Sequence, residues 1–124
     1  MTKAQADRRL ANYLRTHRRN VGLTQRELGN ILGFCDEVAV SRHERFLTTP
    51  SLMAALGYEI IFRVPVSEIF AGLRDEVQEE VEKKLVELEG YLGDRSAKGR
   101  DANITAQKLT WLIERRSSDD ISGR

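Results

Sequence analysis

The sequence predicts an all-α fold. Apolar residues recur every three or four positions along most of the chain, which is the period of an amphipathic helix. Ser, Thr or Asp precedes several of these segments and glycine follows some of them, as expected at helix starts and ends. The apolar stretch from Ile60 to Val66 could form a strand, but its length and Pro65 favour a helix end followed by a turn.

Composition limits the classes of function. The chain has 124 residues, which suits one small domain with an appendage. Its single cysteine, Cys35, excludes an internal disulfide framework and a multi-cysteine zinc site, and two histidines exclude a histidine-rich metal site. We therefore expect no metal, no cofactor and a reducing, cytoplasmic location. No apolar run approaches the ~20 residues that cross a bilayer, and the N-terminus lacks the apolar segment of a secretory signal, so no membrane association is expected.

Two helices are expected before residue 34. The T-x-x-Q sequence near the N-terminus suits a capping box, which predicts a helix over residues 2–20 that Gly22 ends. Thr24 and Glu27 suit a second capping box, which predicts a helix of about nine residues that Gly33 ends. The buried face of this second helix is expected to consist of Leu28, Ile31 and Leu32.

Two further helices are expected after a turn. The third covers residues 36–45, because the Asp36 carboxylate can cap free amides at a helix start. A loop follows over residues 46–49. Thr49 as cap and Pro50 at the first helical position predict the start of a fourth helix. That helix carries the apolar residues Leu52, Ala55, Leu56, Ile60 and Ile61.

The rest of the chain is also expected to be helical. Ser67 suits the cap of a short fifth helix that turns Ile69 and Phe70 inward. A long acidic helix follows over residues 73–92, and a loop covers residues 93–101. The apolar seam of the long helix consists of Leu73, Val77, Val81, Leu85, Leu88 and Leu92.

These elements divide the chain into three parts. We expect a domain over residues 1–72 and a helical extension over residues 73–117. The extension ends in a short amphipathic helix over residues 104–116. Residues 118–124 are polar and are expected to form a disordered tail.

Charge is unevenly distributed between the two halves of the chain. Residues 1–50 hold nine lysines and arginines against five acidic residues, whereas residues 51–124 hold eleven against fourteen. A basic front half with an acidic rear half is typical of a nucleic-acid-binding protein, although solvated helix faces give the same pattern.

The second and third expected helices have the features of a helix-turn-helix unit, in which the second helix lies in the DNA major groove. Gly29 allows the two helices to approach closely, and Gly33 suits the turn between them. Val40 is expected to point into the core. The outer face of the helix over residues 37–45 then presents Glu37, Val38, Ser41, Arg42 and Arg45.

The stretches GLTQRELGNILGF, VSRHER, TPSL and VPVSEIF, taken in this order, resemble the Cro/cI-type (XRE) helix-turn-helix family. The resemblance covers residues 9–72. It implies a five-helix, lambda-repressor-like domain that binds double-stranded DNA and regulates transcription. The sequence departs from the family pattern in two places: Gly29 replaces an alanine, and six residues rather than five separate Gly33 from Val40.

The resemblance implies DNA contacts from the second helix, the third helix and the loop that follows. Gln25 would donate to a phosphate or brace a recognition side chain. Arg42 would pair with guanine or with a phosphate, and Glu37 would accept from cytosine or only favour the helix dipole. Thr48 and Thr49 would hold phosphate. The full set is Gln25, Arg26, Glu37, Val38, Ser41, Arg42, Arg45, Thr48 and Thr49.

The resemblance also implies a structural ion pair between Arg18 and Glu44 that ties the first helix to the recognition helix. His43 is expected to pack in the interior, and Cys35 is expected to fill space in the turn. The sequence contains no phosphate-binding loop, paired-carboxylate site or nucleophile motif. We therefore expect no catalytic residues and no enzymatic activity.

Two kinds of protein partner are compatible with the sequence. One module of this kind contacts about four base pairs, so a homodimer on two half-sites is expected, with residues 73–92 helping to form it. Alternatively, the protein is an antitoxin or another interaction protein whose C-terminal helices bind a protein partner such as a toxin.

Overall fold

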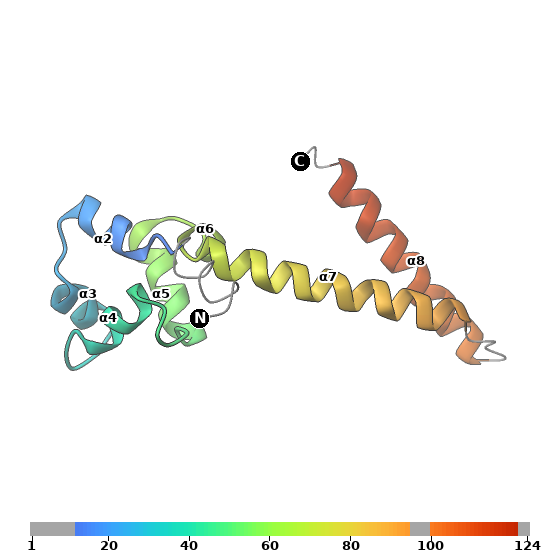
Figure 1. The fold of residues 1–124 in the computed structure, drawn as a ribbon, viewed down its shortest axis with the longest axis horizontal. Coiled ribbons are helices and arrows are strands. Elements are labelled where there is room, and N and C mark those ends of the chain that lie inside the picture. The colour runs from blue at the N-terminus through green and yellow to red at the C-terminus, as the bar shows by residue number, and fades with distance from the viewer. Residues whose placement is uncertain (1–11, 95–99, 122–124) are drawn as a thin grey trace. The chain divides into compact units, whose positions relative to one another are not determined.

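The computed structural model describes residues 12–94 and 100–121 (Figure 1). These residues form seven helices and no strand, which confirms the predicted all-α class. None of the described helices is long and apolar enough to span a membrane. The helices are α2 (Leu14–Val21), α3 (Gln25–Ile31), α4 (Val38–Glu44), α5 (Leu52–Phe62), α6 (Val66–Ile69), α7 (Ala71–Asp94) and α8 (Arg100–Ile121).

The chain divides into two compact units, residues 1–78 and residues 79–124. The division falls within α7, so the first unit contains α2 to α6 and the start of α7. The second unit contains the remainder of α7 together with α8.

One apolar core holds the helices of the first unit together. Tyr58 on α5 is the largest of its fully buried side chains, and the Phe70 ring lies 6.1 Å from the Tyr58 ring. Burial contributes about 1.5–3 kcal/mol for each large apolar side chain, so this cluster is the main source of stability. The buried residues are Leu14, Leu28, Val40, Ala54, Tyr58, Ile69 and Phe70.

The start of α2 differs from the helix expected over residues 2–20. Asn12 and Tyr13 are not helical, so an unbroken helix is wrong at this point, and residues 2–11 lie outside the described part of the chain. The Asn12 side chain accounts for the break. Its Oδ1 accepts a hydrogen bond from the Leu14 amide at 3.1 Å, and its Nδ2 donates to the last two carbonyls of α4 at 2.8 and 3.2 Å. Free amides at a helix start need such acceptors.

The predicted boundaries between α2, α3 and the next turn are confirmed, but the predicted buried face of α3 is wrong at Ile31, which is exposed at the last position of the helix. Gly22 and Gly33 adopt φ angles of 81° and 87°, where a Cβ would be strained. The Thr24 hydroxyl accepts from the Glu27 amide at 3.0 Å, and the Glu27 carboxylate accepts from the Thr24 amide at 2.9 Å. Hydrogen bonding from Thr24, first from its backbone amide and then from its side chain, lowers the pKa of the Glu27 carboxyl.

The helix expected over residues 36–45 is shorter at both ends. The Asp36 carboxylate caps as predicted, but it accepts from the Val38 amide at 2.9 Å, so α4 begins only at Val38. Glu37 occupies the N-cap position and Arg45 the C-cap position. Both residues therefore flank the helix and do not belong to it.

The cap of α5 is Ser51, and the predicted cap Thr49 is wrong. The Ser51 hydroxyl accepts from the Ala54 amide at 3.1 Å. Because a hydroxyl three residues before a free amide is well placed to cap it, Ser51 prevails over Thr49. Pro50 consequently precedes the cap and is not the first helical residue.

The buried side of α5 is not the one suggested by its large aliphatic residues. Ala54 and Tyr58 face the core, whereas Leu52, Leu56 and Ile60 are exposed. The helix is apolar on all sides, so its sequence period does not distinguish the buried side from the open one.

The start of α6 also differs from the prediction. Pro65 occupies the N-cap position, so Ser67 lies inside the helix and is not its cap. The Glu59 carboxylate accepts from the Val66 amide at 2.9 Å and supplies the missing acceptor from α5. The two residues expected to turn inward, Ile69 and Phe70, are buried as predicted.

In the second unit, α7 and α8 exceed the helices expected over residues 73–92 and 104–116. No glycine or proline interrupts residues 100–121, so α8 includes the first four residues of the tail that was expected to be disordered. Residues 122–124 of that tail lie outside the described residues.

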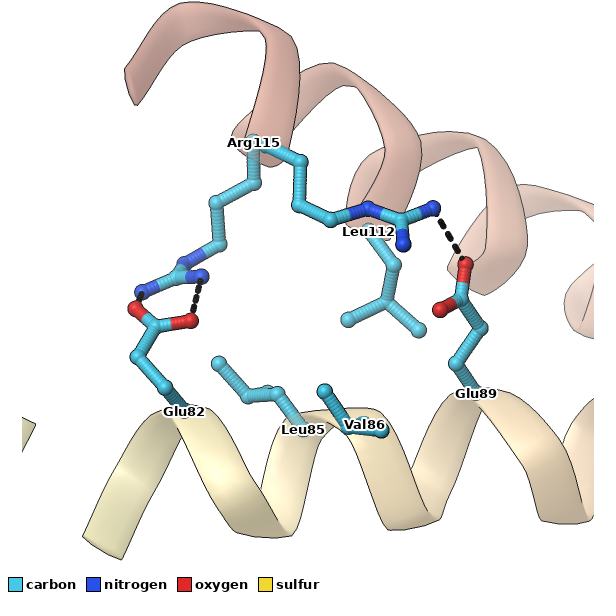
Figure 2. Close-up of a pocket in the computed structure, with 7 residues that line it drawn as sticks. Glu82, Leu85, Val86, Glu89, Leu112 and Arg115 are labelled. Atoms are coloured by element: carbon cyan, nitrogen blue, oxygen red, sulfur yellow. Dashed lines mark hydrogen bonds and ion pairs between the residues drawn. The ribbon is translucent and has the colours of Figure 1, made fainter. Parts of the chain in front are cut away.

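Two ion pairs and a few apolar contacts join α8 to the second part of α7 (Figure 2). The Arg115 guanidinium donates two hydrogen bonds to the Glu82 carboxylate, at 2.5 and 3.0 Å, and lowers the pKa of Glu82. Arg116 donates to Glu89 at 2.6 Å. The buried leucines of this unit are Leu92 and Leu112.

The close approach of α3 to the turn before α4 explains why Gly29 is a glycine. A Cβ built at Gly29 would lie 2.7 Å from the carbonyl oxygen of Asp36. The obstacle is backbone, so it cannot move aside by changing a rotamer. Asp36 belongs to the six-residue connection that is one residue longer than in the resembled family.

We expect Gly29→Ala to destabilise the protein by about 1–3 kcal/mol, because overpacking outweighs the gain of up to about 1 kcal/mol in helix propensity. Urea unfolding followed by circular dichroism measures the change. Gly90→Ala in α7 is the matched control, since a Cβ there would meet no described atom within 4 Å apart from its chain neighbours and the nearby backbone of its own helix, and it should leave stability unchanged or raise it. A more stable Gly29→Ala variant would contradict the steric explanation.

Candidate nucleic-acid interface

Helices α3 and α4 pack against each other and present one side of α4 to solvent. Val40 is fully buried and holds α4 on the core. On the opposite side Val38 and Arg42 are exposed and Ser41 is half-buried, while Glu37 is exposed at the N-cap position. The solvent side of α4 thus carries one apolar, one hydroxyl and one cationic side chain, and an acidic side chain precedes it at the N-cap.

The start of α3 lies beside this surface. The Gln25 amide donates to the Glu44 carboxylate at 3.1 Å, so Gln25 braces α4 from its inner side. Arg26 is largely exposed, and its Nε lies 4.0 Å from the Glu37 carboxylate. Arg26 and Glu37 therefore bring one positive and one negative charge together where α3 meets the start of α4.

The predicted residues at the other end of α4 are exposed. Arg45 donates to the Ser41 carbonyl at 3.4 Å, a long hydrogen bond that leaves most of the guanidinium in solvent. Thr48 and Thr49 lie in the loop before α5 and are also exposed. Phe46 anchors this loop, with its ring 6.1 Å from the Phe70 ring.

The rear of α4 is held by a buried ion pair between Arg18 and Glu44. The Glu44 carboxylate accepts from Arg18 Nε at 2.5 Å and from Arg18 Nη2 at 3.1 Å. Arg18 also donates to the Leu23 carbonyl at 2.9 Å. The Arg18 and Glu44 side chains are only 11% and 3% exposed, so Arg18 has a structural role in the interior.

A second buried polar contact joins α4 to α5. His43 Nδ1 lies 2.7 Å from the Tyr58 hydroxyl, and the His43 ring also meets the Phe34 ring edge-on. Burial lowers the pKa of His43 and raises that of Tyr58, which the Glu44 carboxylate raises further. The packing role predicted for His43 is confirmed, whereas sequence reasoning missed Tyr58 and the α4 contacts of Asn12.

Neither Cys35 nor a cluster of metal-ligating side chains provides a second candidate site among the described residues. Cys35 is exposed in the turn between α3 and α4, so it does not fill interior space as predicted. The described residues contain no group of three or more His, Cys, Asp or Glu side chains that could hold a metal ion.

Removing the charge of Glu44 should strongly destabilise the first unit. We expect Glu44→Gln to cost about 3–5 kcal/mol, because it leaves the buried Arg18 guanidinium without its counter-charge. Urea unfolding measures the loss. Asp75→Asn is the control, since Asp75 pairs with Arg74 at the surface and should matter little. Equal effects of the two substitutions would show that the buried pair has no special role.

His43 should make stability depend on pH. Its pKa in the folded chain lies below the ~6.5 of an unfolded histidine, so the unfolded chain takes up the proton first as the pH falls. The contribution is fully present above pH ~6.5 and is lost as the pH falls through the folded pKa. Urea unfolding at pH 7.5, 6.5 and 5.5 should show this decline in the wild type and a flatter profile in His43→Gln. Identical profiles would refute the assignment.

Comparison with known proteins adds no assignment to this geometry. No family model, no curated protein and no solved structure matches the chain.

Proposed function

We propose that this protein is a sequence-specific, double-stranded-DNA-binding transcription regulator of the Cro/cI type. In this proposal α3 and α4 are the helix-turn-helix pair, and α2 to α6 are part of a lambda-repressor-like domain over residues 1–72. The main support is the asymmetry of α4. Val40 and Glu44 anchor it from behind, while Val38 and Arg42 are exposed on the other side and Glu37 is exposed at the N-cap.

The proposed contacts follow from position along α4. A major groove about 12 Å wide accepts an α-helix, so the solvent side of α4 would face base edges. Arg42 can donate two hydrogen bonds to guanine, Glu37 can accept from cytosine N4, and Val38 can contact a thymine methyl group. Ser41, half-buried on the same side, can bond to more than one base.

The flanking residues suit the phosphate backbone. Arg26 at the start of α3, and Arg45, Thr48 and Thr49 after α4, are exposed at the two ends of the recognition surface. Such contacts position a protein on the duplex without recognising sequence. We assign Gln25 to bracing, because its amide already donates to Glu44.

A homodimer is part of the proposal. One α4 helix covers too few base pairs to select a site in a genome, whereas two copies on half-sites one helical turn apart multiply the selectivity. The two-fold symmetry of the protein would then match a palindromic operator.

A second candidate function is binding of a protein partner, such as a toxin, by the second unit. Its support is the number of large apolar side chains that α7 and α8 leave exposed. A partner-neutralising segment would gain protection from hydrogen exchange on binding, whereas a regulator without such a partner would not need this surface. The exposed apolar side chains of this unit are Val81, Val86, Leu88, Tyr91, Ile104, Trp111 and Ile113.

DNA titration tests the proposed function. After selection of bound sequences from a random pool, we expect affinity to fall steeply with salt and to differ by ~10³ or more between selected and random duplexes. Arg42→Ala should lose about ten- to hundred-fold of that discrimination at one guanine position.

Arg74→Ala, which removes an exposed arginine at the start of α7, is the control and should keep the discrimination. The absence of salt-dependent DNA binding by the wild type would refute DNA binding. If Arg42→Ala weakens binding to all sequences alike, Arg42 contacts phosphate and does not recognise a base.

A further inference from the structure

The side chain of Asn12 joins the chain just before α2 to the end of α4. Its Nδ2 donates to the carbonyls of His43 and Glu44 at 2.8 and 3.2 Å, and its Oδ1 accepts from the Leu14 amide at 3.1 Å. A side-chain amide both donates and accepts, whereas an ionised carboxylate only accepts and an apolar side chain does neither. These three hydrogen bonds therefore require an amide at position 12.

The backbone that carries Asn12 is itself fixed to the core. The Tyr13 amide donates to the carbonyl of Ile69 on α6 at 2.7 Å, and the Leu14 side chain is fully buried. A short side chain in a staggered rotamer on an anchored backbone has little freedom to move. Asn12 is therefore a fixed point from which the end of α4 is held.

Asn12 holds α4 by its backbone, unlike the other inner contacts of this helix. With only seven residues, α4 is too short to be stable without contacts from outside. Val40 packs in the core and the Glu44 carboxylate accepts from Arg18, but both contacts are made by side chains of α4. The last carbonyls of a helix have no partner within the helix, and at the end of α4 the Asn12 amide reaches two of them.

This backbone contact lies beside the candidate base contact. Arg42 directly precedes His43 in the sequence, and its side chain is exposed. A guanidinium that donates two hydrogen bonds to guanine needs both distances near about 2.9 Å, and such bonds are lost beyond about 3.5 Å. A displacement of the end of α4 by about 1 Å is therefore enough to break the base contact while the fold remains intact.

We propose that Asn12 is a positioning residue for DNA recognition. It holds the carbonyls of His43 and Glu44 so that Arg42 meets guanine at the distance and angle that two hydrogen bonds require. Asn12 acts through Arg42 and contacts no base itself. This inference rests on the proposed function and deepens it, because it adds a determinant of specificity from outside the expected set of DNA-binding residues.

A purely structural role of Asn12 would have a different effect on binding. Loss of stability raises the unfolded fraction, which weakens binding to selected and random duplexes by the same factor and leaves the ratio of the two affinities unchanged. Loss of position weakens the contact to guanine but spares the phosphate contacts that dominate binding to random duplexes. The ratio of the two affinities therefore separates positioning from folding.

Titration of selected and random duplexes with Asn12→Asp tests the proposal. Aspartate has nearly the same shape and still accepts from the Leu14 amide, but its carboxylate has no hydrogen to donate to the two carbonyls of α4. We expect the ratio of affinities to fall about ten- to hundred-fold, as in Arg42→Ala, because the same base contact is lost. Asn20→Asp, at an exposed position on α2, makes the same change of charge and should keep the wild-type ratio.

Two further variants sharpen the test. Asn12→Ser is neutral, and its hydroxyl can accept from the Leu14 amide but is too short to reach both carbonyls, so it should lower the ratio as Asn12→Asp does. The double variant Asn12→Asp/Arg42→Ala should lose no more discrimination than Arg42→Ala alone, since both changes remove one contact. Additive losses in the double variant would overturn the role assigned to Asn12.

Hydrogen exchange measures the position of α4 without DNA. The amides of Arg45 and Leu47 donate to the carbonyls of Ser41 and Arg42 at the end of α4, whereas the Leu32 amide donates within the last turn before Gly33. In Asn12→Asp the acceleration of exchange should be about tenfold greater at Arg45 and Leu47 than at Leu32, because the opening is local. Equal acceleration at all three amides would show a loss of global stability alone and would overturn the inference.

The outcomes separate the inference from the proposed function. An unchanged ratio of affinities in both Asn12→Asp and Asn12→Ser, with a wild type that discriminates between duplexes, would overturn the role of Asn12 and leave the proposed function standing. A wild type that binds selected and random duplexes equally would overturn the proposed function and, with it, the role of Asn12 in recognition.

Discussion

The arrangement of the first unit depends on the carboxylate of Glu44. It accepts hydrogen bonds from Arg18 on α2 and Gln25 on α3, and so joins three helices at one buried point. Burying a carboxylate is costly unless it is paired with a positive charge and fully hydrogen-bonded. Here the Arg18 guanidinium provides both the counter-charge and hydrogen-bond donors. Asn12 and His43 add further polar contacts at the same end of α4. The inner side of α4 is thus fixed by directional bonds, which leaves the residues on its outer side free to differ without loss of the fold.

The longer connection between α3 and α4 restricts position 29 to glycine and changes where Glu37 lies on the surface. It brings the Asp36 carbonyl against α3, which requires glycine at position 29. It also uses the Asp36 carboxylate as the cap of Val38. Glu37 is consequently moved out of the helix to its N-cap position, beside Arg26. The same extra residue therefore determines a core contact, a helix start and the position of one candidate base contact.

Local sequence signals predicted those parts of the fold that local interactions determine. The Thr24 and Glu27 box and the two left-handed glycines each involve residues within one turn of each other, and all were predicted. The failures involve partners distant in sequence. Asn12 breaks α2 through carbonyls of α4, and Tyr58 is buried with its ring against His43 and Phe70. For α5, two hydroxyl residues competed as caps and an all-apolar sequence concealed which side is buried. The candidate site was predicted as a set of residues, but the bracing of Gln25 by Glu44 required coordinates.

The charges around α4 bear on how the proposed regulator would select its site. At the start of the helix, Asp36 is used as a cap and Glu37 offsets the nearby Arg26, so this end attracts phosphate weakly. At the other end, Arg42 and Arg45 are exposed. Cationic contacts supply most non-specific affinity, whereas base contacts supply discrimination. The Glu37 carboxylate lowers the affinity for every duplex. The loss is smaller for a duplex that offers Glu37 a hydrogen-bond donor, such as cytosine N4, than for a duplex that offers none. In this proposal the acidic residues that weaken general attraction are a source of specificity.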